Sequence, residues 1–206
     1  MTRIDERPLA QDELDRNPLA QFAAWFGEAR ERGVVDPHAM ALATATRDGD
    51  PSVRMVLMKD FDESGITFFT NYGSRKAVEL ERNPLAALLF HWPALGRQVR
   101  IEGRVRRADR AESVAYAHSR SRASQLSALA SPQSREVPSR EWLEERVAAL
   151  DREHPRGDLP VSDEWGGYRL DPEAWEFWQH RANRLHDRFR YERAPAGAWT
   201  IARLGP

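Results

Sequence analysis

The chain has 206 residues, with 31 basic and 32 acidic side chains that leave a formal net charge of −1. This balance excludes a general polyanion-binding protein, which needs a concentrated excess of Lys and Arg. The absence of cysteine excludes disulfides, thiolate metal ligands and a cysteine nucleophile. The N-terminus lacks the apolar core of a signal peptide, and no apolar run reaches the roughly 18 residues of a membrane span. We therefore expect a soluble cytoplasmic protein that binds neither membranes nor nucleic acids.

The first predicted element is a helix that begins at Pro18. Asn17 is a favourable N-cap, Pro18 suits the first helical position, and Gly33 suits a left-handed C-terminal cap. Its apolar residues recur on one face: Leu19, Phe22, Phe26 and Ala29. We expect one domain over residues 1–206, in which the N-terminal segment 1–16 is prone to disorder.

The middle of the chain predicts antiparallel strands. Small and β-branched residues over 39–47 are followed by the hairpin turn Asp48-Gly49-Asp50 and a return strand over 51–61. A third strand is predicted over 66–72, then a short helix over 74–82 that stops before Pro84. Strands over 85–92 and 98–106 follow, and the second alternates between apolar and polar residues.

Helices dominate the next stretch, and strands return near the C-terminus. We predict helices over 109–130 and 138–153, strands in WGGYRL (165–170) and AWEFWQ (174–179), a basic segment over 184–193, and a last strand over 198–204. Short antiparallel strands with late helices predict a mainly β fold with flanking helices, organised as a closed or partly closed barrel.

Several common catalytic motifs are missing from the sequence. It contains no P-loop, no GxGxxG, no HExxH and no GxSxG nucleophile elbow, and its six histidines are scattered. We therefore expect no metal site, and we expect any chemistry to depend on a bound organic cofactor.

Two clusters of basic residues suggest an anion site. Arg75 and Lys76 follow Gly73 and Ser74 at a strand-to-helix junction, where free backbone N–H groups and the helix dipole favour a phosphate. The alternative is a pair of solvated cations. The run from Arg54 to Lys59 places two cations in an apolar strand, which also fits the solubilising charges of an edge strand.

Two further clusters lie in the second half of the chain. Tyr116, Arg120 and Ser124 are spaced for one face of a helix and could hold a second phosphate, although this spacing alone favours a polar helix surface. Trp178 and the basic segment RLHDR (184–188) suit a planar anionic heterocycle, through stacking and charged hydrogen bonds. The alternative is a core tryptophan beside surface arginines.

Taken together, these motifs resemble one known family. The run 54–59, FFTNYGSRK, GRQVRIEG, YAHSRSRASQ, SPQS, WGGYRL and the tail FWQ…RLHDRFRYER with its closing RLGP resemble pyridoxamine 5′-phosphate oxidases, over residues 17–206. The resemblance implies a homodimer of FMN-binding split β-barrels with FMN in clefts between the subunits. It also implies oxidation of pyridoxine 5′-phosphate and pyridoxamine 5′-phosphate to pyridoxal 5′-phosphate, a reaction of vitamin B6 biosynthesis and salvage. Dioxygen would be reduced to hydrogen peroxide, and the amine substrate would release ammonia.

The same resemblance implies the site residues. FMN would be bound by Arg54, Met55, Val56, Leu57, Met58, Lys59, Phe69, Thr70, Arg75, Lys76, Gln98, Gln133, Ser134, Trp178 and Arg188. The substrate would be bound by Lys59, Tyr116, Arg120, Ser124, Arg184, Leu185 and His186. Of these, Arg184 and His186 would be the catalytic residues, which position the ring and stabilise charge. The only two lysines of the chain, Lys59 and Lys76, both fall in these sets.

The sequence departs from the family pattern at two places. Its segment before the first helix is shorter than the family's, whose Arg- and Tyr-containing stretch can fold over the substrate, and Phe69 stands where relatives often have Tyr. Two other functions stay open. One is a split-barrel flavin oxidase for another planar substrate, of the phenazine-biosynthesis type. The other is a non-catalytic protein that binds flavin or pyridoxal 5′-phosphate.

Overall fold

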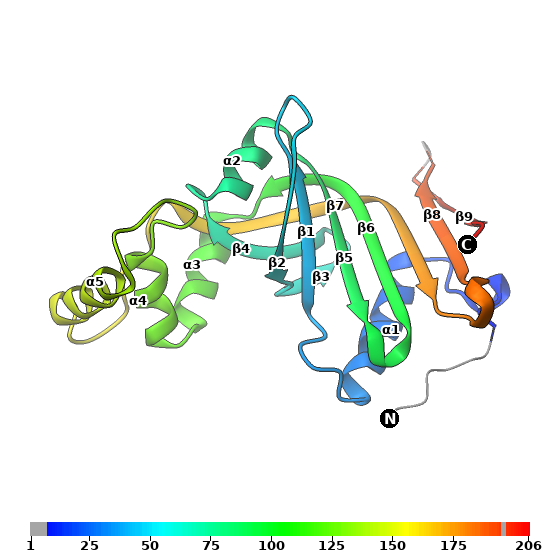
Figure 1. The fold of residues 1–206 in the computed structure, drawn as a ribbon, viewed down its shortest axis with the longest axis horizontal. Coiled ribbons are helices and arrows are strands. Elements are labelled where there is room, and N and C mark those ends of the chain that lie inside the picture. The colour runs from blue at the N-terminus through cyan, green and yellow to red at the C-terminus, as the bar shows by residue number, and fades with distance from the viewer. Residues whose placement is uncertain (1–7, 195–196) are drawn as a thin grey trace.

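The computed structural model describes residues 8–194 and 197–206. Within these residues, nine antiparallel strands form one sheet (Figure 1). They are β1 (Ala39–Ala45), β2 (Pro51–Leu57), β3 (Asp60–Asp62), β4 (Gly65–Asn71), β5 (Leu85–Trp92), β6 (Arg97–Arg107), β7 (Trp165–Gln179), β8 (Asp187–Arg193) and β9 (Trp199–Arg203). The α-helices are α1 (Pro18–Glu31), α2 (Arg75–Arg82), α3 (Arg110–Ser119), α4 (Arg122–Ala130) and α5 (Arg140–Glu153). None of the described helices is long and apolar enough to cross a membrane.

The sheet branches at β7, its longest strand. The strand order is β2-β1-β5-β6-β7-β4-β3, and β8 and β9 continue from β7 on a separate branch. The first part of β7 pairs with β4 and its last part with β8, while β6 pairs along nearly its whole length. The register shifts at Gly103, where a Cβ atom would lie 2.0 Å from the carbonyl oxygen of Asp171. The two strands predicted over 165–179 are therefore one continuous strand, and Glu173 is the extra residue of a bulge within it.

Helix α1 closes the core of the half-barrel. Its N-cap is as predicted, because Asn17 Oδ1 accepts the backbone N–H of Leu19 at 2.9 Å, and Gly33 adopts a φ of 68° beyond its end. Phe22 is fully buried, and its ring centroid lies 5.0 Å from that of Phe90 and 5.6 Å from that of Trp175. Burial of this aromatic face holds the helix against the sheet.

The structure corrects the prediction for two segments. The return strand predicted over 51–61 is broken, because the backbone N–H of Met58 bonds to His38 beside β1 whereas that of Lys59 bonds to Thr67 in β4. The helix predicted over 109–130 is also broken. Helix α3 ends at Ser119, Arg120 is extended, and Ser121 caps α4 by accepting the N–H of Ser124. A capping serine directly after the break gives α4 its own start.

Part of the N-terminal segment packs against the domain. Leu9 and Leu14 are buried, the backbone N–H of Leu9 donates to Asp187 Oδ2 at 2.9 Å, and Arg203 Nη2 donates to the Leu9 carbonyl. Residues 9–15 of the segment expected to be prone to disorder therefore pack against the domain, and residues 1–7 lie outside the described residues.

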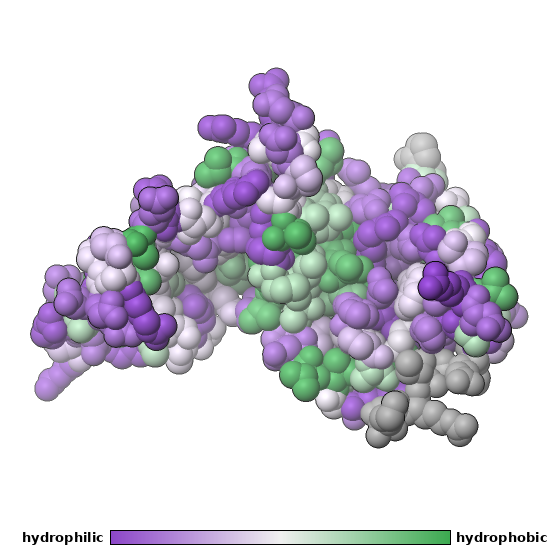
Figure 2. Space-filling view, viewed as in Figure 1, coloured by the Kyte–Doolittle hydropathy of each residue, from purple (hydrophilic) through white to green (hydrophobic). Residues whose placement is uncertain are grey.

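An apolar surface covers the edge of the sheet at β2. Val53 and Met55 are 68 % and 64 % exposed, and Leu57 is also exposed. Their neighbours across the β1–β2 ladder are alanines, Ala43 opposite Val53 and Ala41 opposite Met55. Figure 2 shows hydrophobic side chains gathered over the middle of this face. Large apolar side chains exposed side by side on a sheet commonly mark a contact surface.

Candidate functional site

The edge strand β2 carries the first cation of the site. Arg54 is half-buried, and its Nη1 donates to the carbonyl of Leu42 at 3.0 Å and to Thr44 Oγ1 at 2.6 Å. Its Nη2 donates to Ser52 Oγ and lies 3.4 Å from Glu79 Oε2. These contacts from β1, β2 and α2 fix the guanidinium in one orientation.

The second cation is Lys76, in the first turn of α2. Its side chain is buried, at 8 % exposure, and its Nζ donates to Thr70 Oγ1 at 3.1 Å, Ser74 Oγ at 3.2 Å and Gln133 Oε1 at 2.9 Å. All three acceptors are neutral, and no carboxylate of the described residues pairs with this ammonium. Burial, and then the positive charge of Arg54, lower the pKa of Lys76 from 10.5 to about 8.

A layer of aromatic rings forms another wall. The Phe69 and Tyr116 rings stack at 4.1 Å, and the Trp165 ring lies 5.6 Å from that of Phe69. Two cations lie against this layer: Lys59 Nζ is 5.9 Å from the Tyr116 ring centroid, and Arg120 Cζ is 5.2 Å from that of Trp165. Cation–π attraction helps to hold both long side chains beside the rings.

These groups line one pocket, here called the β2 pocket. It gathers many of the residues that the family resemblance implies for FMN and substrate, namely Arg54, Met55, Val56, Leu57, Lys59, Phe69, Thr70, Lys76, Tyr116, Arg120, Ser124 and Gln133. Tyr116, Arg120 and Ser124 do not share one helix face, because the chain breaks between α3 and α4. The break nevertheless turns all three toward the same pocket.

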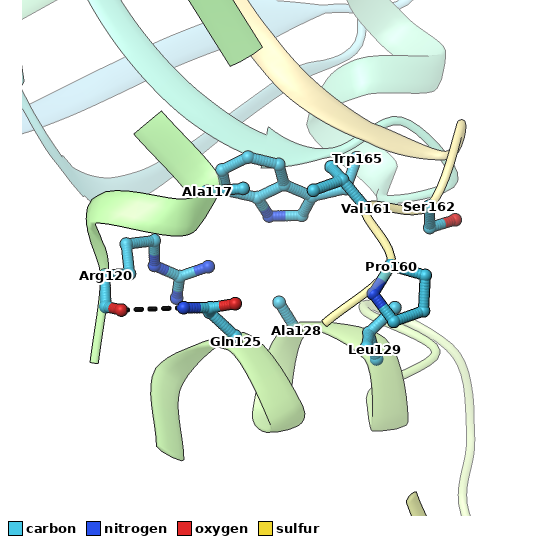
Figure 3. Close-up of a pocket in the computed structure, with 9 residues that line it drawn as sticks. All are labelled: Ala117, Arg120, Gln125, Ala128, Leu129, Pro160, Val161, Ser162 and Trp165. Carbon is cyan, nitrogen blue, oxygen red and sulfur yellow. Dashed lines mark hydrogen bonds between the residues drawn. The ribbon is translucent and has the colours of Figure 1, made fainter. Parts of the chain in front are cut away.

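A smaller hollow lies next to the β2 pocket and shows which contacts fix the chain between α3 and α4. Figure 3 shows Gln125 of α4 pointing toward Arg120, and Gln125 Nε2 donates to the Arg120 carbonyl at 2.8 Å. Trp165 and Arg120 line both spaces. The extended backbone of Arg120 is therefore fixed from α4, while its guanidinium faces the aromatic layer.

Several predicted residues lie outside the β2 pocket. Met58 is buried in the core, and Arg75 does not line the pocket, although its Nε donates to Glu79 Oε1 at 2.8 Å. Ser134 follows Gln133 and is exposed, with a left-handed φ of 68°. The remaining predicted residues form a second group around β7 and β8, here called the tail cluster: Gln98, Trp178, Arg184, Leu185, His186 and Arg188.

Strand register and ring contacts bring much of the tail cluster together. Trp178 pairs with Gln98 on one side and with Arg188 on the other. The His186 ring lies 4.5 Å from that of Trp178, and burial, followed by the charges of His180 and Arg184, lowers the pKa of His186. Arg188 is fixed by Glu176 at 2.8 Å. Arg184 and Leu185 are exposed in the turn before β8.

Within one chain the β2 pocket and the tail cluster are far apart. Trp165 of the pocket and Trp178 of the cluster are thirteen positions apart on β7, which is roughly 40 Å along a strand. Figure 1 shows β7 running from the side of α3 to that of β8. No residue of the tail cluster lines the β2 pocket. One copy of the chain therefore presents two separate partial sites.

Sequence reasoning missed some residues of the β2 pocket. Trp165 was noted only as part of a motif, and the remaining missed lining residues are Asn71, Ser121, Ser127, Ala128 and Ser131. Glu79 was also not predicted, although its position four residues after Arg75 is a signal for an ion pair within a helix. The small polar residues carried no such signal, because their role depends on the break between α3 and α4.

The chemistry available to the β2 pocket is anion binding beside a flat apolar wall. Arg54 and Lys76 lie at one part of its lining, and Lys59 and Arg120 lie against the aromatic rings at another. Charged donors of this kind bind phosphate strongly. In the described part of the chain no three His, Asp or Glu side chains come together as metal ligands would.

Comparisons with known proteins give the family. Residues 26–152 match the family model described as pyridoxamine 5′-phosphate oxidase, and residues 165–206 match the pyridoxine 5′-phosphate oxidase C-terminal dimerisation region. The curated pyridoxine/pyridoxamine 5′-phosphate oxidase of Rubrobacter xylanophilus is 53 % identical over 198 residues, covering 96 % of this chain and 91 % of that protein. That of Herminiimonas arsenicoxydans is 51 % identical, covering 100 % of this chain and 97 % of its own.

A solved structure agrees with this result. The structure of PhzG from Burkholderia lata 383, in complex with tetrahydrophenazine-1-carboxylic acid, has a TM-score of 0.91 and 34 % identity and covers 98 % of this chain and 99 % of its own. The match confirms the predicted split-barrel fold. Since the family model covers more than half of the sequence and the curated relatives match almost all of it, the chain belongs to the pyridoxine/pyridoxamine 5′-phosphate oxidase family.

Proposed function

We propose that this protein is an FMN-dependent pyridoxine/pyridoxamine 5′-phosphate oxidase, which converts pyridoxine 5′-phosphate or pyridoxamine 5′-phosphate into pyridoxal 5′-phosphate. The observation that carries the proposal is the β2 pocket, which gathers two pairs of cations beside aromatic rings in a chain 53 % identical to a curated oxidase. Two phosphate groups, one from FMN and one from the substrate, need two such pairs.

The residues around Lys76 suit the phosphate of FMN. A buried ammonium surrounded only by neutral oxygens lacks a counter-ion, and a phosphate dianion would provide one. The first turn of α2 adds backbone N–H groups that have no partner within the helix. Arg54 lines the same pocket and supplies a second cation. Phosphate at this end would leave Val56, Leu57 and Phe69 to border the flavin ring.

The second pair suits the phosphate of the substrate. Lys59 and Arg120 are held against Tyr116 and Trp165, and the hydroxyls of Tyr116 and Ser124 line the same pocket. Two cations and two hydroxyls match the charge and hydrogen-bonding capacity of a phosphate monoester. This set favours a phosphorylated substrate over one that carries only a carboxylate.

A homodimer would complete each site. The tail cluster lies far from the β2 pocket of its own chain, and the family model over 165–206 is described as a dimerisation region. The exposed apolar strand β2 offers a surface that a second copy can bury. In this arrangement Gln98, Trp178 and Arg188 of one chain would border the flavin held by the other.

The catalytic work of the protein is then chiefly orientation. FMN, when bound, supplies a two-electron acceptor that dioxygen can reoxidise, with formation of hydrogen peroxide. The phosphate-binding residues fix one end of the substrate, and Arg184 and His186 approach the pyridine ring from the partner subunit. The lowered pKa of His186 keeps its imidazole neutral near pH 7, able to accept or donate a hydrogen bond. Correct placement of the reacting carbon lowers the barrier by limiting its freedom.

The experiment supplies FMN-loaded protein with pyridoxine 5′-phosphate in air and measures aldehyde and hydrogen peroxide together. Equal amounts of both support the proposal. Retained FMN without aldehyde would refute it and favour either a different planar substrate or a non-catalytic flavin-binding role. Anaerobic addition of a different planar substrate, such as tetrahydrophenazine-1-carboxylic acid, separates those two outcomes, because an oxidase for such a substrate bleaches its flavin whereas a binding protein leaves the flavin oxidised.

A further inference from the structure

Glu79 is a buried carboxylate that the proposed function does not yet use. It lies on α2 and is only 4 % exposed. Its Oε1 accepts a hydrogen bond from Arg75 Nε at 2.8 Å. Its Oε2 accepts one from Ser52 Oγ at 2.5 Å, another from Thr44 Oγ1, and lies 3.4 Å from Arg54 Nη2. One carboxylate therefore joins β1, β2 and α2.

The partners of Glu79 are also the partners of Arg54. Thr44 Oγ1 accepts from Arg54 Nη1 at 2.6 Å while it donates to Glu79, and Ser52 Oγ is shared in the same way. The two hydroxyls therefore lie between the carboxylate and the guanidinium, and each forms a hydrogen bond with both groups. Glu79 acts on Arg54 both directly and through these two side chains, so its loss would remove the direct contact and also the acceptor that orients both hydroxyls.

The charge of this group matches a phosphate. Arg54, Arg75 and Lys76 contribute three positive charges and Glu79 one negative charge, which leaves a net charge of +2. A phosphate monoester carries about −1.5 to −2 at pH 7. Burial alone would raise the pKa of Glu79, but hydrogen bonds from Ser52, Thr44 and Arg75 lower it to about 2, so the carboxylate is ionised at any working pH.

We propose that Glu79 is a positioning residue for the cofactor phosphate, because it holds Arg54 and Arg75 in the orientation that binds FMN. This inference rests on the proposed function. It places Glu79 behind the arginines, where it orients them and does not touch the phosphate. It also gives a role to Arg75, whose side chain is 62 % exposed and does not line the β2 pocket. Glu79 anchors this exposed cation near the pocket.

An effect of charge alone and a positioning role for Glu79 predict opposite changes in FMN affinity when Glu79 is replaced. Removing a negative charge close to a bound dianion should strengthen FMN binding if charge alone matters. If Glu79 positions the arginines, its removal should weaken binding, because two long side chains regain their freedom and must be ordered again when the phosphate binds. The sign of the change in affinity therefore separates the two explanations.

The test compares apoprotein of the wild type with Glu79→Gln, Glu79→Ala and Glu81→Gln. Glu81 lies on the same helix and pairs with Arg107 and Tyr168, away from the β2 pocket, so Glu81→Gln is a matched control. Dissociation constants for FMN and for riboflavin are measured by quenching of flavin fluorescence, and thermal unfolding of each apoprotein is recorded. Riboflavin lacks the phosphate, so it reports on the rest of the site.

We expect Glu79→Ala to raise the FMN dissociation constant by about 10- to 100-fold, the size of a lost charged hydrogen bond. Glu79→Gln, which keeps an oxygen acceptor, should raise it less. Riboflavin binding should change by less than about threefold in every variant. Unchanged or tighter FMN binding, or equal losses for FMN and riboflavin, would overturn the inference. If Glu79→Ala does not fold, the FMN and riboflavin dissociation constants of Glu79→Gln decide whether the inference holds. Failure of the wild type to bind FMN would instead refute the proposed function.

Discussion

Replacement of Lys76 by methionine should stabilise the apoprotein while it destroys FMN binding. The ammonium is buried among neutral oxygens, and its pKa falls from 10.5 to about 8. A shift of this size corresponds to about 3 kcal/mol of unfavourable free energy at about 1.4 kcal/mol per pKa unit. Methionine has a similar length and no charge. The loss of three hydrogen bonds, at about 0.5 kcal/mol each, offsets about half of the gain, so we expect the variant to be about 1 to 2 kcal/mol more stable at pH 7.

The pH dependence of this difference follows from the sign of the shift. Because the folded state holds the Lys76 proton less tightly than the unfolded state, the cost is complete below pH 8 and disappears as the pH rises above 10.5. The advantage of Lys76→Met should therefore fall by about 2 kcal/mol between pH 7 and pH 9.5, which removes most or all of it. FMN binding should weaken over the same range, since the ammonium that attracts the phosphate is lost.

Urea unfolding of FMN-free wild type and Lys76→Met at the two pH values measures the effect. Excess FMN should reverse the order of stability, because a ligand at a hundred times its dissociation constant adds about 2.7 kcal/mol to the protein that binds it. Lys76→Arg is a useful control, since it keeps the charge but not the compact ammonium. A Lys76→Met apoprotein less stable than wild type at pH 7, or a difference independent of pH, would refute the reasoning.

Three other predictions concern the substrate, the dimer and the core. Arg120→Ala should raise KM for pyridoxine 5′-phosphate by about 10- to 100-fold and leave the FMN content unchanged. Steady-state kinetics and flavin absorbance measure the two effects. Loss of flavin would show that Arg120 binds the phosphate of FMN and not that of the substrate. Val53→Asp puts a charge on the exposed apolar strand β2 and should raise the dimer dissociation constant at least about 100-fold, as measured by analytical ultracentrifugation. An intact dimer would exclude β2 from the interface. Phe22→Ala should cost about 3–5 kcal/mol in urea unfolding, because the ring is fully buried among Phe90, Trp92 and Trp175; a cost below 1 kcal/mol would contradict this packing.

Local signals predicted the elements whose ends are determined by nearby residues. Asn17, Pro18 and Gly33 define the first helix, and Ser74 marks the start of α2. The segments that failed depend on distant partners. Nothing near Met58 and Lys59 reveals that one residue bonds beside β1 and the next to β4. The two strands predicted over 165–179 are one strand, β7, because that segment pairs with three different strands.

The residues of the site also fall into those that local sequence predicted and those that depend on distant partners. Family resemblance selected Lys76 and Arg120, and the β2 pocket brings both together with Gln133 and Ser124. It did not select Glu79, since the role of that carboxylate appears only when β1, β2 and α2 are packed. Residues that contact a ligand leave recognisable motifs, whereas residues that hold those contacts in place depend on tertiary structure.

The length of β7 has a genetic consequence. If each cleft takes the β2 pocket from one chain and the tail cluster from the other, lesions in the two halves are complementary. A dimer of one Arg120→Ala chain and one His186→Ala chain would contain one cleft with both defects and one with neither. Co-expression of two inactive alleles would then restore up to half the activity per mixed dimer, whereas two alleles with lesions in the same half would restore none.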